Sequence, residues 1–304
     1  MAQNTKIQWA HDTGNIWIGC THVHDGCKNC YAEKLIGRFN PDNPMWGNDQ
    51  PRRAVKSAFA KILGYQAFAA STNSIRRVFI GSLMDIFEKP FPLVDHKNNP
   101  LFIEETVVDT HDKKEKVIRR RKTTEDLRRE FFYQVVPACP NLQFLLLTKR
   151  PSNINKYIPE AWKTYPPHNV IYGATVVDNK TMWDVMKKFE KVHGRFFLSI
   201  EPLLEPLDIF EMLHHYENEE FFVPNWIIVG GESGSGYRPF EAEWARTIQG
   251  ACQIYDIPFF MKQMNKPVGT THEQAEKMIP EDLMIRQFPP FRLDGNSRQL
   301  SFIS

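Results

Sequence analysis

The chain has 304 residues, of which 42% are hydrophobic and 24% charged, and its net charge is +2. This composition is typical of a soluble globular protein with one large domain or two ordinary ones, and the nearly neutral charge indicates no class of partner. The sequence contains no run of about 18 apolar residues, so we expect no membrane span. The N-terminal residues lack the apolar stretch of a signal peptide, which predicts a cytoplasmic protein with reduced thiols.

Short apolar runs recur along the chain and read as strands. They are nearly continuous instead of alternating, as expected for strands buried on both faces of a parallel sheet. Helix-compatible segments at 123–136, 181–192 and 242–255 separate several of them, and the last strands start roughly 30 residues apart, about one βα unit each. The predicted strands are 16–18, 77–82, 142–150, 169–176, 195–202, 225–233 and 258–263.

Nearly every predicted strand ends in a polar residue. In a (β/α) barrel the carboxyl ends of the strands meet on one face, where active sites are built, whereas a doubly wound sheet uses only the ends near one switch point. We therefore predict an α/β fold with a TIM-like (β/α) barrel, full or partial, over residues 1–268. Residues 91–122 are rich in proline and charge and form an insertion after strand two, and residues 269–304 form a C-terminal extension packed on the barrel.

Two segments have the composition of a surface that contacts nucleic acid. Residues 111–130 are locally basic, which fits either a solvated insertion or an element that contacts phosphates. The loop 40–53 carries Trp46, which we expect to be exposed and to form, with Arg52 and Arg53, an edge that stacks on bases and binds phosphates.

Cys20, Cys27 and Cys30 lie within eleven residues in a C-x6-C-x2-C pattern that also encloses two histidines. Three thiolates can hold three irons of a [4Fe–4S] cluster, three thiolates with one histidine can hold a structural zinc, and a nucleophilic cysteine with a histidine base also fits. The cysteines follow the first predicted strand and no second C-x2-C pair exists, which favours the iron–sulfur cluster. Cys139 and Cys252 lie far away in sequence and are expected to be buried as small apolar residues.

A three-cysteine loop after the first strand of a (β/α) barrel resembles the radical S-adenosylmethionine superfamily. The resemblance implies that S-adenosylmethionine binds the fourth iron and that its reductive cleavage yields a 5′-deoxyadenosyl radical. The usual spacing in that superfamily is C-x3-C-x2-C, with an aromatic residue before the third cysteine, where this chain has Asn29. Tyr31, directly after Cys30, is similar to the spore photoproduct lyase branch.

A resemblance over more of the chain rests on GCTHVHDGCKNCYAE, VFIGSLMDIF, LLLTKRP, LSIEPLLEPLD, IIVGGESGSGYRP and PFFMKQM. Together these segments resemble the phage-associated three-cysteine-motif proteins, a family grouped with radical S-adenosylmethionine barrels and often encoded beside a separate partner protein. The resemblance implies the fold and the cofactor class, and it does not identify a substrate.

The resemblance also suggests roles for polar residues at the strand ends. The end of strand two would bind the amino group of S-adenosylmethionine, cations would orient its carboxylate or a substrate phosphate, and carboxylates would accept from the ribose hydroxyls. A ring of structural ion pairs explains the charged members as well. The candidate cofactor-binding residues are Tyr31, Gly81, Ser82, Asp85, Thr148, Lys149, Ser199 and Glu201, and the candidate catalytic or substrate-binding residues are Arg150, Glu232, Lys262 and Gln263.

Two functions follow from these observations. The first is a radical S-adenosylmethionine enzyme that acts on a nucleic acid or nucleotide. The second is a non-catalytic barrel, stabilised by zinc or a cluster, that binds a partner protein or nucleic acid in a phage–host setting. Loss of the metal would unfold the second kind of protein, and S-adenosylmethionine would not bind to it.

Overall fold

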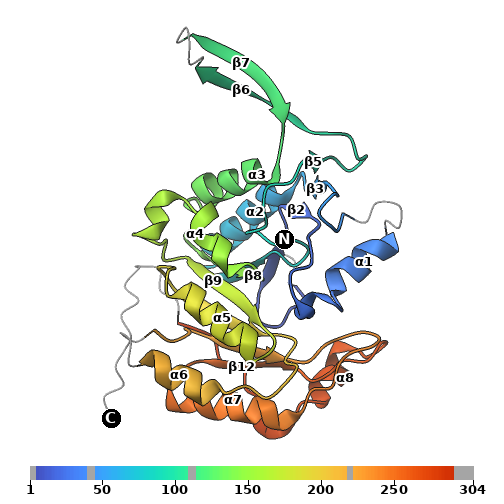
Figure 1. Ribbon diagram of the computed structural model, residues 1–304, viewed down its shortest axis with the longest axis vertical. Helices are drawn as coiled ribbons and strands as arrows, with labels where there is room; N and C mark the ends of the chain where they lie inside the picture. The colour runs from blue at the N-terminus through green and yellow to red at the C-terminus, as the bar shows by residue number, and fades with distance from the viewer. Residues whose placement is uncertain (1–4, 40–44, 109–113, 218–221, 291–304) are drawn as a thin grey trace.

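A computed structural model describes residues 5–39, 45–108, 114–217 and 222–290 of the chain. Its main sheet has seven parallel strands, whose spatial order follows the chain (Figure 1). A doubly wound sheet would reverse its strand order, so the predicted α/β class and the barrel-like order are confirmed. Among the described residues the first and last strands do not pair with each other, so the curled sheet forms an open half-barrel. The strands are β1 (Asp12–Gly14), β4 (Arg76–Ile80), β8 (Leu142–Thr148), β9 (Val170–Val176), β10 (Phe196–Ile200), β11 (Ile227–Gly230) and β12 (Phe259–Gln263).

The first strand of the sheet was predicted wrongly. The apolar run 16–18 does not join the main sheet; β1 pairs with β4 there instead. Trp17 and Ile18 form β2 (Trp17–Ile18), which pairs antiparallel with β3 (Arg52–Ala54), and β3 pairs with β5 (Leu93–Val94). The apolar character of the run has another cause, because Ile16 and Trp17 are fully buried in the core between the sheet and its helices.

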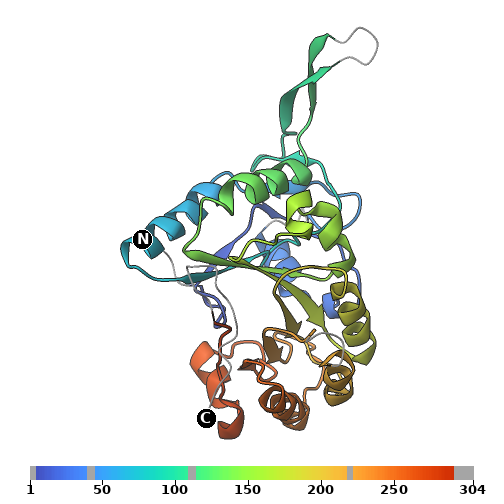
Figure 2. The ribbon, with the colours of Figure 1, turned by 90° about the vertical axis from the view of Figure 1, so that its left-hand side faces the viewer.

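Helices cover the outer face of the sheet (Figure 2). Their apolar sides meet Val78, Phe144, Leu198 and similar strand residues in one continuous core, as expected for helices that follow parallel strands. Three of the helix starts are fixed by capping boxes, formed by Thr123, Asp178 and Thr271. The helices are α1 (Tyr31–Phe39), α2 (Ala58–Ser71), α3 (Thr124–Glu130), α4 (Ile154–Tyr157), α5 (Asn179–Phe189), α6 (Ile209–Glu217), α7 (Ala242–Ile254) and α8 (His272–Lys277), with a π turn at Phe131–Val135 and 3-10 turns at Asp25–Cys27, Pro151–Asn153, Glu160–Lys163 and Glu281–Leu283.

The inner face of the sheet divides into an apolar half and a polar half. At the amino ends of the strands, a second apolar cluster includes Trp9, Phe197 and Trp226. Phe197 lies so close to Gly173 that a Cβ on the glycine would be 2.2 Å from the ring. Because side chains alternate along a strand, the residues two and four positions further on face the same side, at the carboxyl ends, and many of these are polar.

The predicted insertion contains β5 and a hairpin formed by β6 (Phe102–Val108) and β7 (Glu115–Arg121), which projects from the body (Figures 1 and 2). The described part of the predicted C-terminal extension, up to residue 290, packs on the sheet: Phe288 contacts Trp226, and the Trp226 Nε1–H donates to the Gln287 carbonyl at 3.0 Å. No helix in the described ranges is long and apolar enough to cross a membrane.

Candidate cofactor site at the carboxyl end of the sheet

The cysteine loop, residues 20–30, lies over the carboxyl ends of four strands. The Tyr31 hydroxyl, just beyond it, donates to the Ser82 carbonyl after β4 at 2.7 Å. Arg150, after β8, contacts Cys20, and Gly26 packs so tightly against Val177, after β9, that a Cβ would be 2.8 Å from its side chain. Asn29 reaches Glu232 after β11. The loop therefore caps the polar half of the inner face.

All five cysteines are free thiols. Cys27 and Cys30 lie one turn apart, since the Cys30 N–H donates to the Cys27 carbonyl at 3.1 Å. Cys20 and Cys30 contact the same small apolar cluster, which includes Trp46. Cys139 and Cys252 are buried in the main core, as predicted.

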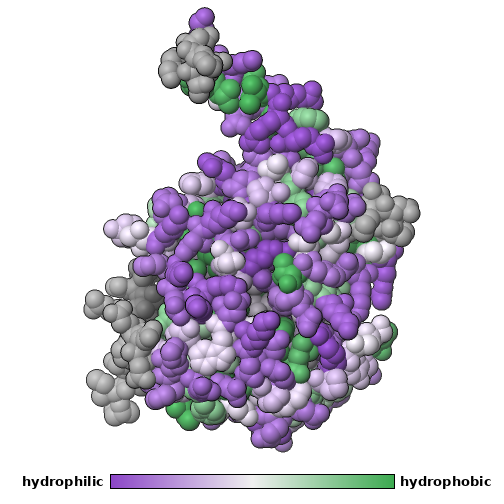
Figure 3. Space-filling view, in the orientation of Figure 1, coloured by the Kyte–Doolittle hydropathy of each residue, from purple (hydrophilic) through white to green (hydrophobic). Residues whose placement is uncertain are grey.

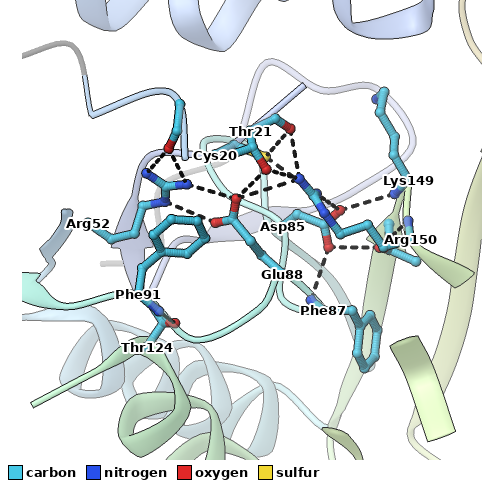
Figure 4. A network of polar contacts seen from close by, with 12 residues as sticks. Cys20, Thr21, Arg52, Asp85, Phe87, Glu88, Phe91, Thr124, Lys149 and Arg150 are labelled. Atoms are coloured by element: carbon cyan, nitrogen blue, oxygen red, sulfur yellow. Dashed lines mark hydrogen bonds and ion pairs between the residues drawn. The ribbon is translucent and has the colours of Figure 1, made fainter. Parts of the chain in front are cut away.

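A buried polar network fixes the Cys20 side of the loop (Figure 4). Arg150 donates to the Thr21 carbonyl and to Asp85, both at 2.7 Å, and its Nη1 lies 3.6 Å from the Cys20 sulfur. Burial and the Asp85 charge raise the pKa of Cys20 to about 12, although the Arg150 guanidinium acts in the opposite direction. This raised pKa favours the neutral thiol form of Cys20 at physiological pH.

Asp85 has no hydrogen-bonding capacity left for a ligand. Its two oxygens accept from the Thr148 hydroxyl at 2.7 Å, the Phe87 N–H at 3.0 Å, the Lys149 N–H at 3.1 Å and Arg150 at 2.7 Å. A carboxylate has about four lone-pair sites, so an incoming ammonium would have to displace one of these donors. Asp85, Thr148 and Arg150 thus join β8 to the cysteine loop in this structure.

Glu88 and Arg52 extend the network inward. Arg52 donates to Glu88 through two nitrogens, at 2.9 and 2.8 Å, and both side chains are almost completely buried. Glu88 also accepts from the Thr21 hydroxyl at 2.8 Å. The remaining Arg52 donors bind three carbonyls of the loop that contains Trp46. The predicted exposed edge is therefore wrong, because Trp46 is 7% exposed and Arg52 is 0% exposed, and only Arg53 of the three is partly accessible.

The opposite side of the cysteine loop is held by the glycine-rich segment after β11. The Asn29 amide donates to Glu232 and to the Gly236 carbonyl, each at 3.0 Å. Glu232 also pairs with Arg238, and Arg238 donates to the Asp25 carbonyl at 3.1 Å. These contacts outweigh burial and hold the Glu232 pKa below its usual range. Asn29, in the position where the resemblance would place an aromatic residue, therefore ties the loop to the sheet.

Between these two attachments lies the polar half of the inner face. The Lys149 ammonium lies 3.4 Å from the Thr175 hydroxyl, and Lys262 pairs with Glu201. Ser199 lies between them in register with Thr175 on the neighbouring strand. Glu201 Oε1 is buried without a hydrogen-bond partner, which is costly unless a donor binds there. This half of the face thus presents the Glu201 carboxylate, which suits a hydrogen-bond donor, and the Lys149 and Lys262 ammonium groups, which suit a negative charge.

The remaining predicted residues shape the backbone. Gly81 has φ of +110°, and a Cβ there would lie 2.9 Å from the Met84 carbonyl, so the turn after β4 favours glycine. Ser82 accepts from Asn15 at 2.7 Å, and Gln263 donates to the Gly231 carbonyl at 3.0 Å. Thr21, Glu88 and Arg238 also belong to the site and were not predicted from the sequence. Only Glu88 gave a sequence signal, because it directly follows the apolar pair Ile86 and Phe87 and a carboxylate buried with them needs a partner.

The donor chemistry of the loop fits a thiolate-bound cluster, but its geometry is not yet that of a metal centre. Across the described residues, no three His, Cys, Asp or Glu side chains are grouped so that they could hold a metal ion. His24 does not complete a set, because its Nδ1 accepts from the Gly26 N–H at 3.0 Å and the neutral ring therefore carries its proton on Nε2. The three thiols share one short loop, so binding a cluster requires its side chains to turn toward a common point.

The family model described as "Protein of unknown function (DUF5131)" matches residues 4–122 and 120–282. No curated protein and no solved structure matches the chain.

Proposed function

The chain belongs to the DUF5131 family, and we propose that it is a radical S-adenosylmethionine enzyme that acts on a nucleic acid or nucleotide. The observation that carries the proposal is the position of the cysteine loop, which places three free thiols over the carboxyl ends of a curled parallel sheet. Active sites of (β/α) folds are built at that end. The polar residues of the inner face lie at the same end of the sheet.

In this proposal Cys20, Cys27 and Cys30 hold a [4Fe–4S] cluster. Such a cluster would leave one iron for S-adenosylmethionine and, once reduced by an external one-electron donor, would supply the electron that cleaves it to methionine and a 5′-deoxyadenosyl radical. Arg150 is placed to counter the charge of a Cys20 thiolate, since its guanidinium is 3.6 Å from the sulfur.

The chain's own residues would orient S-adenosylmethionine along the inner face. Lys149 and Lys262 are cations that suit its carboxylate. Glu201 has an unpaired oxygen that suits its ammonium or a ribose hydroxyl, and it takes over the role that the sequence suggested for Asp85. Thr175 and Ser199 offer hydroxyl groups on the neighbouring strands.

The test is anaerobic purification followed by iron and sulfide analysis and electron paramagnetic resonance of the reduced protein, with and without S-adenosylmethionine. About four irons per chain and a signal that changes when S-adenosylmethionine is added are expected. Cys27→Ala should lose the cluster. The matched control Cys252→Ala changes a buried residue of α7 and should keep the cluster. A single zinc with no response to S-adenosylmethionine would refute the proposal and favour the non-catalytic barrel.

A further inference from the structure

The β6–β7 hairpin forms an arm without any partner in the described structure. Its seven residue pairs run in register from Phe102–Arg121 to Val108–Glu115, and no third strand joins it. Strands of that length extend about 23 Å. One face of the arm is open to solvent: Phe102, Val108 and Val117 lie on it and are 44%, 59% and 63% exposed. An isolated two-stranded ribbon is only marginally stable in water. Contact with a binding partner would therefore stabilise this arm.

The base of the arm is fixed to the body. Arg120 donates to both oxygens of Asp126 at the start of α3, at 2.9 and 2.7 Å, and also pairs with Glu105. Backbone hydrogen bonds join Lys122 to Leu93 and Leu101 at the end of the ribbon. The arm can therefore hold a bound partner at a defined position relative to the sheet.

The charge of the arm is concentrated on one strand. Residues 116–122 read KVIRRRK, with five cations and no carboxylate. Arg120 is used at the base, but Arg119 and Arg121 are exposed and form no ion pair with any described residue. In the view of Figure 3, hydrophilic side chains cover most of the described part of the arm, next to a hydrophobic patch. This strand is complementary to a polyanion.

Arg119 and Arg121 share a face of the ribbon with an aromatic ring. The Arg119 guanidinium lies 4.4 Å from the Phe102 ring centroid, and that of Arg121 lies 5.9 Å away. Phe102 thus supports two guanidinium groups whose hydrogen-bond donors are free to bind phosphate oxygens. Glu104, directly opposite Arg119 on the same face, weakens the positive potential of this pair.

We propose that the β6–β7 arm docks in the major groove of duplex DNA, with Arg119 and Arg121 on the phosphates. The major groove of B-form DNA admits a two-stranded ribbon, whereas that of A-form RNA is too narrow. The inference rests on the proposed function for its choice of a nucleic acid and extends it by naming the duplex and the surface that holds it. DNA binding itself requires no cluster, so the two proposals can fail separately.

The test measures fluorescence anisotropy of a labelled DNA duplex of about two helical turns against the full chain over a range of salt concentrations. Arg119→Ala/Arg121→Ala removes two phosphate contacts, which lowers the slope of log K against log salt by about 1.8 and weakens binding about 60-fold at about 0.1 M salt. The matched control Lys187→Ala/Lys191→Ala removes two exposed cations on and next to α5 and should bind like the wild type. Glu104→Gln should tighten binding.

Four outcomes would overturn the inference: no binding of the DNA duplex, equal losses in the arm and control variants, equal affinity for an RNA duplex of the same sequence, or self-association through the arm without DNA binding. Cys27→Ala should bind DNA like the wild type even if it carries no iron. Loss of iron in that variant with DNA binding retained would support both proposals. DNA binding by a wild type that never holds iron would support the arm alone.

Discussion

Arg52→Met tests the buried pair beneath the cysteine loop. The substitution removes both hydrogen bonds to Glu88, the contacts to three loop carbonyls, and a guanidinium that lies 3.8 Å from the Phe91 ring centroid. It also leaves the 1% exposed Glu88 with only Thr21 at 2.8 Å and Arg150 at 3.5 Å. Breaking a buried pair in this way costs about 3–5 kcal/mol, because a charge remains desolvated without its partner.

For a chain of this length, that cost lowers the melting temperature by roughly 6–10 °C. Urea denaturation and calorimetry of the metal-free protein measure it. Arg53→Met is the matched control, since Arg53 is the next residue in β3 and makes a single hydrogen bond to Asn98 at 3.4 Å. We expect its free energy of unfolding to stay within about 0.5 kcal/mol of the wild type.

The double variant Arg52→Met/Glu88→Leu distinguishes two causes of the stability loss, an unpaired buried charge and a loss of packing. Removing both charges should recover part of the stability that Arg52→Met loses, because no unpaired carboxylate remains. A loss below about 1 kcal/mol for Arg52→Met, the value of an exposed pair, would refute the reasoning.

Three further perturbations test other parts of the structure. Gly173→Ala forces a Cβ to within 2.2 Å of the Phe197 ring and should cost about 1–3 kcal/mol in urea denaturation, with part of the loss recovered by adding Phe197→Leu. Burial and two neighbouring arginines lower the pKa of His11 from 6.5 to about 4. Between these two pH values the unfolded state binds more protons than the folded state, so stability falls as the pH drops. The His11→Gln variant should therefore lose less stability than the wild type when the pH falls from neutral to about 4. In the metal-free protein at pH near 8, iodoacetamide should modify Cys30 before Cys20, because the pKa of Cys20, raised to about 12, lowers its thiolate fraction on the order of 1000-fold.

Each of these expectations has a contrary result. Equal losses for Gly173→Ala with and without Phe197→Leu would show that the ring does not cause the strain. Parallel stability–pH curves for the wild type and His11→Gln would remove His11 as a cause of acid sensitivity. Mass spectrometry that finds Cys20 modified as fast as Cys30 would contradict the neutral, protected thiol.

The sequence was sufficient for most of the sheet. Six predicted apolar runs match β4, β8, β9, β10, β11 and β12. Both faces of these strands are buried, so consecutive residues are apolar and the run is visible in the sequence. The run 16–18 carries the same signal for a different reason, because Trp17 is buried in the core without belonging to the main sheet. Hydrophobicity reports burial, and it does not report which strand is the hydrogen-bonding neighbour.

The sequence by itself thus determined the α/β class, the strand ends at which polar residues collect, and the short loop that carries three thiols. Only the tertiary structure decided which polar side chains meet. Arg52 pairs with Glu88 over 36 positions and Asn29 with Glu232 over 203, and neither pairing leaves a local pattern. Periodicity follows from the geometry of one element, whereas the partner of a buried charge depends on which elements the fold brings together.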